Sequence, residues 1–296
     1  MRKFLLIPLL LILCACSEEI DVRSRSDYHD YLAVQAVLTN WPDQPQQVVL
    51  SHSISYFHDE AQPMVKGASV MVNDVVFKEM TDGVYVAPMG YCCQQGEEYH
   101  LHIRLADGAE YEADAATPEP GFEIEEIDYA WGGGKTMDND SLWTIGVWGL
   151  EKDIDSYYLI THAVNGLPKP YGMATVTEDT YFNDHDIAAF PIEPLLQTAE
   201  NRKLYGDCFK YLETGDILTL EIWSLERPFE KFLSSMKSGG TSIPLFSSQP
   251  ANQSTNIRGG QVMGFFGVCW VVRASVVVDD PFRPYFKRMM PPTPPM

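Results

Sequence analysis

The chain has 296 residues, of which 45% are hydrophobic and 12% aromatic, and it has a formal net charge of −20. This composition excludes an intrinsically disordered chain, and the length allows one large domain or two ordinary ones. The excess of acidic residues repels phosphate groups, so it argues against nucleic acid as a partner and against attachment to anionic lipid by charge alone.

Residues 1–15 have the parts of an export signal. Arg2 and Lys3 form a basic start, and the apolar run that follows is shorter than the roughly 20 residues of a membrane-spanning helix. The segment Leu13-Cys14-Ala15-Cys16 resembles the lipobox of bacterial lipoproteins, which implies that Cys16 becomes the lipidated first residue and that Cys14 is discarded. Several acyl chains on one cysteine hold a protein to a membrane durably, whereas one chain holds only marginally. The alternative is an ordinary secretory signal with incidental cysteines.

Residues 16–30 are predicted to be a flexible tether because they are rich in Ser, Asp, Glu and Arg. Ser17-Glu18-Glu19 resembles the surface-export tag of Bacteroidota lipoproteins. We therefore expect an outer-membrane lipoprotein that is exposed at the cell surface, with the periplasmic face of that membrane as the alternative.

From residue 31 the sequence alternates between apolar and polar residues in short segments separated by turn residues. Asn73-Asp74 and Asp107-Gly108 are typical of hairpin turns. The number and length of the segments predict an immunoglobulin-like β-sandwich over residues 31–118, closed by the linker-like Thr117-Pro118-Glu119-Pro120-Gly121. The segments lie at residues 32–38, 48–56, 70–72, 75–77, 84–86, 99–105 and 111–115.

Residues 119–285 are predicted to form a second β-rich domain with one or two helices, so the fold class is mainly β. The clearest helix spans 228–238: it opens at Pro228, repeats apolar residues at helical spacing and ends at Gly239-Gly240. A weaker helix is predicted within 190–205, and the Pro-rich residues 286–296 are predicted to be an extended tail. The predicted strands lie at 143–147, 158–162, 218–222 and 268–278.

Three stretches carry a resemblance to a known family. They are YLAVQAVLTNWPDQPQQVVLSHS, GEEYHLHIRLADGAEYEADAATPEP and PANQSTNIRGGQVMGFFG, in that order. They resemble the domain-of-unknown-function 4249 family of Bacteroidota outer-membrane lipoproteins, over nearly all of residues 31–280. The resemblance implies an N-terminal sandwich, a helix in the second half and a gene that often lies beside a TonB-dependent receptor, but no established activity.

A late motif is the most specific part of this resemblance. Its glycines permit tight backbone geometry or the close approach of another segment, and its asparagines can bond nearby backbone groups. One interpretation is a packing motif that fixes the last strands to the predicted helix, in which Gly260 needs a positive φ. The other is a recognition loop for a partner. The motif consists of Pro250, Asn252, Asn256, Ile257, Gly259, Gly260, Phe266 and Gly267.

No segment matches a catalytic or metal-binding motif. The sequence WGGGKT at 131–136 lacks the first glycine of a phosphate-binding loop, since position 129 is Tyr129, and we expect a flexible loop there. His100 and His102 share a strand face with Arg104, which would repel a cation. The segment Asp138-Asn139-Asp140 lacks the glutamate that a calcium loop needs at position 149, and the alternative of a looser calcium site there, or at Asp184 and Asp186, stays open. We therefore expect no catalytic residue, no metal and no cofactor.

Four cysteines follow Cys16, namely Cys92, Cys93, Cys208 and Cys269, and an exported chain allows them to form disulfides. Cys208 and Cys269 are a possible pair within the second domain. A bond between the adjacent Cys92 and Cys93 would be strained. The sequence leaves the pairing open, because four cysteines allow three full pairings.

These observations favour a lipid-anchored binding or accessory subunit of an outer-membrane assembly, beside a TonB-dependent transporter, rather than an enzyme. Its expected partners are outer-membrane lipid, reached through Cys16, and an outer-membrane protein. Two alternatives stay open: a surface hydrolase that acts on glycan or peptide, and a solitary structural or adhesive lipoprotein.

Overall fold

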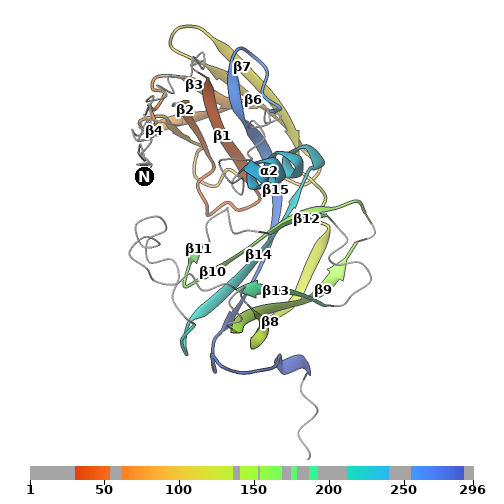
Figure 1. The fold of residues 1–296 in the computed structure, drawn as a ribbon. Coiled ribbons are helices and arrows are strands. Elements are labelled where there is room, and N and C mark those ends of the chain that lie inside the picture. Colours follow the sequence, from red (N-terminus) through yellow and green to blue (C-terminus); the bar gives the residue numbers. More distant parts are fainter. Residues whose placement is uncertain are drawn as a thin grey trace, which may run out of the picture.

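The computed structural model describes residues 31–53, 62–135, 141–152, 154–168, 175–178, 187–192, 212–239 and 255–289. These residues form a mainly β fold, as predicted. Figure 1 shows two β-rich bodies, with helix α2 at their junction and strand β15 running through both.

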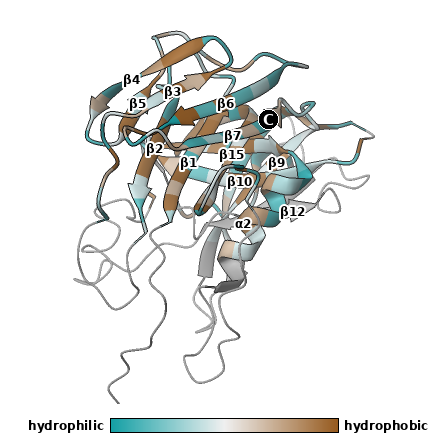
Figure 2. Cartoon of the chain, turned by 90° about the horizontal axis from the view of Figure 1, so that it is seen from above, coloured by the Kyte–Doolittle hydropathy of each residue, from teal (hydrophilic) through white to brown (hydrophobic). Residues whose placement is uncertain are grey.

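Seven strands form most of the first body, here called the first sandwich. They enclose one hydrophobic core, and the predicted alternation is visible in β1, where Leu32, Val34, Ala36 and Leu38 are at most 2% exposed. Figure 2 shows the hydrophobic residues gathered along these strands. The strands are β1 (Leu32–Thr39), β2 (Gln47–His52), β3 (Ser69–Val72), β4 (Val75–Thr81), β5 (Val84–Val86), β6 (Glu98–Arg104) and β7 (Glu110–Ala116).

The second body packs a three-stranded sheet, in the order β13-β9-β8, against the sheet that contains β10 and β14. Aromatic residues fill the core between them, including the fully buried Trp143, Tyr129 and Tyr158. The strands are β8 (Phe122–Lys135), β9 (Ser141–Glu151), β10 (Tyr157–Val164), β11 (Leu167–Pro168), β12 (Thr175–Glu178), β13 (Ile187–Ile192) and β14 (Ile217–Leu225).

The glycine-rich segment at 131–135 differs from the expected flexible loop. It continues β8 and pairs with β9 as far as Lys135 and Ser141. The register shifts between Trp131 and Gly134, so the extra residues form a bulge, and Gly132 has the positive φ of 84° that glycine tolerates.

Strand β15 (Val262–Val277) joins the two bodies into one twelve-stranded sheet. Its first half pairs in parallel with β1, from Leu32 opposite Val262 to Thr39 opposite Cys269. Its second half pairs antiparallel with β14, beginning with Trp270 opposite Ser224. Residues 262–269, which lie inside the predicted second domain, therefore form part of the first sandwich.

Helix α2 (Arg227–Gly239) confirms the helix predicted at 228–238. Phe229 and Phe232 anchor it to β15, with the Phe229 and Phe265 rings stacked at a centroid distance of 5.1 Å. The second predicted helix is wrong at its start, because residues 187–192 form strand β13. Residues 193–205 lie outside the described residues.

Residues 279–289 run across β8 and β9. Arg283 is 5% exposed and forms an ion pair with Asp128, which is 2% exposed. The Phe286 ring meets Trp148 edge-on at 5.4 Å, and a short 3-10 helix, η3 (Lys287–Met289), follows. The predicted extended tail at 286–296 therefore begins with packed residues, and positions 290–296 lie outside the described residues.

Candidate functional site

The described part of the late motif lies where the first sandwich, β15 and α2 meet. Asn256 and Ile257 precede β15, and Ile257 is buried in the core of the first sandwich. Phe266 is a fully buried residue of β15. Pro250 and Asn252 lie outside the described residues.

The Asn256 side chain joins two strands. Its amide nitrogen donates hydrogen bonds to the carbonyl oxygens of Phe266, at 2.8 Å, and Asp114, at 3.1 Å. Its amide oxygen accepts a hydrogen bond from the Phe266 backbone nitrogen at 3.0 Å. The next residue, Arg258, exchanges two backbone hydrogen bonds with Glu112 of β7. The segment before β15 is thus fixed between β7 and β15.

Three glycines of this region allow close packing. Gly259 has a φ of 136°, and a Cβ there would overlap the Glu110 carbonyl oxygen. Gly264 has a φ of 104° against the Val34 backbone. A Cβ at Gly267 would lie 2.7 Å from the Phe229 ring. The expectation for Gly260 is wrong: it has no positive φ, and a Cβ there would meet Tyr111 at an ordinary 3.5 Å.

A polar cluster lies on the exposed surface beside this segment. Asp114 accepts hydrogen bonds from His100 and from Arg258, both at 2.7 Å. The hydrogen bond from His100 lowers the pKa of the Asp114 carboxyl most, and the hydrogen bond from Arg258 lowers it further. Within the part of the chain that the structure describes, no group of three His, Cys, Asp or Glu residues could hold a metal ion.

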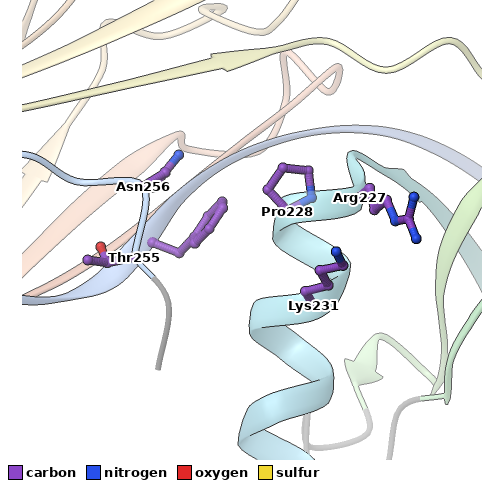
Figure 3. A pocket seen from close by; sticks show the side chains of 6 residues that line it. Arg227, Pro228, Lys231, Thr255 and Asn256 are labelled. Carbon is purple, nitrogen blue, oxygen red and sulfur yellow. The ribbon is translucent and has the colours of Figure 1, made fainter. Parts of the chain in front are cut away.

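A cavity of about 260 Å³ separates α2 from the segment before β15, and Figure 3 shows its lining. Pro228 and Phe265 contribute its apolar surface, and Arg227 and Lys231 are exposed cations on α2. We call this cavity the α2 groove. It is lined by Arg227, Pro228, Lys231, Thr255, Asn256 and Phe265.

The two cations of the α2 groove have no carboxylate partner among the described residues. The Arg227 guanidinium lies 5.9 Å from the centre of the Tyr157 ring instead. Arg227 is the first residue of α2, where the helix dipole disfavours positive charge, and Lys231 lies just past the first turn, where the dipole has little effect. Their positions are therefore not explained by helix stability.

A second hollow of about 470 Å³ adjoins the α2 groove across Arg227 and Pro228. The segment before β10 lines it, including Ser156, whose buried hydroxyl has no hydrogen-bond partner within the described part of the chain. Glu226 lies between the two bodies, and its carboxylate accepts a hydrogen bond from the Ala116 backbone nitrogen at 3.3 Å. Burial raises the pKa of Glu226.

The described cysteines, Cys92, Cys93 and Cys269, are free thiols. The Cys93 thiol faces the Cys269 carbonyl oxygen at 3.5 Å, and burial raises its pKa to about 12. Burial also raises the pKa of Cys269, so both thiols are protonated and unreactive at neutral pH. Cys16 and Cys208 lie outside the described residues. Because Cys269 is a free thiol, the possible Cys208–Cys269 disulfide is not formed in this structure.

Asn256 is recognisable in the sequence as part of the late motif, whereas the other residues that line the α2 groove are not among the residues of that motif. The sequence did hold a sign of the groove. Two cations, Arg227 and Lys231, lie four residues apart at the start of the predicted helix, a place where acidic residues are favoured. Thr255 and Phe265 gave no such signal, since only the tertiary fold brings them to α2.

The structure defines a mainly β protein whose two bodies share one long strand and meet at one helix. The chain belongs to the family described as "Domain of unknown function (DUF4249)", whose model matches residues 17–275. No curated protein matches it. Among the described residues, no helix is both long enough and apolar enough to cross a membrane.

Proposed function

We propose that this protein is a lipid-anchored outer-membrane protein that acts as a non-catalytic binding or accessory subunit beside a TonB-dependent transporter. The observation that carries the proposal is the lipobox-like Leu13-Cys14-Ala15-Cys16, which directly precedes the family match at residues 17–275. Such an anchor fixes the folded body near a membrane surface, where its useful partners are other membrane proteins.

The arrangement of the two bodies supports a binding role. Because β15 pairs with β1 and with β14, surface features on the two bodies keep a fixed relation to each other. The Asn40 side chain adds to this connection, since it donates a hydrogen bond to the Val271 carbonyl and accepts one from the Val271 backbone nitrogen. A rigid body of this kind suits a subunit that holds a partner in one orientation.

Cys16→Ala is expected to abolish lipid attachment, because the thiol that carries the acyl chains is removed. Labelling cells with a radioactive fatty acid measures this directly. Cys14→Ala is the matched control, and its mature protein should carry as much label as the unmodified protein. Loss of label in Cys14→Ala alone would show that cleavage occurs elsewhere.

The unmodified protein is expected to co-purify with a TonB-dependent transporter. The test extracts membranes in mild detergent, captures the full chain and identifies the bound proteins by mass spectrometry. A chain captured in the same way with Cys16→Ala shows which proteins depend on membrane anchoring. Recovery of the lipidated chain with no outer-membrane protein would rule out the accessory role.

A further inference from the structure

We propose that the α2 groove is the docking surface for an extended acidic segment of the protein partner. This inference rests on the proposed function and specifies how the partner is held. It follows from the charges around the groove, from the spacing of those charges and from the apolar surface beside them.

The charge distribution singles out the groove. Among the Lys and Arg side chains that the structure describes, which do not include those of Lys135 and Lys237, only Lys78, Arg227 and Lys231 form no ion pair with a carboxylate. Two of these three lie together on α2. The rest of a chain with a net charge of −20 repels an acidic segment, so such a segment would be attracted only where unpaired cations gather.

The spacing of the cations fits an extended chain. Arg227 and Lys231 are four residues apart on a helix, which is a rise of about 6 Å. Side chains at alternate positions of an extended strand point the same way and are about 6.5–7 Å apart. Two carboxylates in a Glu-X-Glu segment can therefore meet the two cations one to one.

The directions of the side chains favour two carboxylates over a single phosphate. Figure 3 shows that the cationic ends of Arg227 and Lys231 do not converge on one point. Pro228 and Phe265 line the same groove and offer apolar surface to the methylene groups of glutamate. Thr255, at the opposite wall, can donate a hydrogen bond from its hydroxyl, whose oxygen already accepts one from Ile257.

Binding of a fluorescein-labelled octaglutamate peptide to the purified, lipidated full chain tests this inference. Fluorescence anisotropy should show binding at low ionic strength that weakens as salt is added. In Arg227→Gln/Lys231→Gln the dissociation constant should rise at least about tenfold, because both charge contacts are lost. The melting temperature of this variant should change little, since both side chains are exposed and only the contact of Arg227 with the Tyr157 ring is lost.

Two controls make the result specific. Lys78→Gln removes the other unpaired cation and should leave the dissociation constant unchanged, and labelled octaglutamine should not bind. The inference is overturned if octaglutamate does not bind, if it binds the double variant equally well, or if Lys78→Gln weakens binding as much. It is also overturned if inorganic phosphate or anionic-lipid vesicles displace octaglutamate more effectively than unlabelled octaglutamate does.

Repeating the detergent capture with Arg227→Gln/Lys231→Gln separates this inference from the proposed function. Loss of a transporter that the unmodified chain retains supports both. Retention of that transporter by the double variant overturns the docking surface and leaves the proposed function standing. If the unmodified chain captures no outer-membrane protein, the proposed function fails, whereas the peptide assay still decides whether the groove selects acidic segments.

Discussion

Gly264→Ala is expected to lower the free energy of unfolding by about 3–5 kcal/mol. Gly264 has a φ of 104°, which L side chains rarely adopt, and it lies opposite Val34 in the pairing of β1 with β15. A Cβ at this position would overlap the Val34 carbonyl oxygen. Backbone atoms of a central strand cannot rotate away as the end of a side chain can, so β1 and β15 must separate locally.

Gly260→Ala is the matched control, a few residues earlier in the same late segment. It has no positive φ, and its added Cβ would lie 3.5 Å from the Tyr111 hydroxyl, so its cost should stay within about 0.5 kcal/mol. Urea denaturation followed by tryptophan fluorescence measures both variants. Equal stability of the two variants would contradict the steric explanation for Gly264.

Individual strands and the helix of this fold were predictable because the residue patterns that indicate them lie within a few consecutive residues. Strand β1 buries every second residue, and α2 combines Pro228 near its start with apolar residues at helical spacing. The glycine-rich end of β8 was predicted as a loop for the same reason, since three consecutive glycines disfavour a strand in isolation. Pairing with β9 and a bulge outweigh that preference.

The connection between the bodies was not predictable from local patterns. β15 was partly recognised as an apolar segment, but nothing in its sequence specifies that it pairs first with β1, about 230 residues earlier, and then with β14. The same holds for the α2 groove, whose walls come from the helix and from the segment before β15. The motif residues Asn256 and Phe266 were found as a pattern, and only the structure shows that they bond to each other.

The buried ion pair between Asp128 and Arg283 is the second feature with a large expected effect. Besides Asp128, the Arg283 guanidinium donates hydrogen bonds to the carbonyl oxygens of Tyr129 and Tyr285, both at 3.0 Å, and to the Asp279 carboxylate at 2.9 Å. Asp128 also accepts a hydrogen bond from the Lys287 backbone nitrogen at 2.5 Å. The pair therefore fixes the segment at 279–289 to β8.

Asp128→Ala is expected to lower the free energy of unfolding by about 3–5 kcal/mol, because it leaves a buried guanidinium without its main partner. Arg283→Met should cost a similar amount for the reverse reason, since the Asp128 carboxylate is then buried without its cation. Urea denaturation measures each loss. Arg104→Met serves as the control, because Arg104 is 62% exposed and its pair with Glu110 spans 3.7 Å, so less than about 1 kcal/mol should be lost.

The double variant Asp128→Ala/Arg283→Met combines the two single changes and decides whether the two charges act as a pair. It removes both charges, so neither is left buried without its partner, which is what makes each single loss large. The double variant should thus be more stable than the sum of the single losses implies, with a coupling free energy of about 1–3 kcal/mol. Losses that simply add would mean that each residue acts through its own backbone contacts, Asp128 through Lys287 and Arg283 through Tyr129 and Tyr285. In that case the segment at 279–289 would be held by hydrogen bonds rather than by the ion pair.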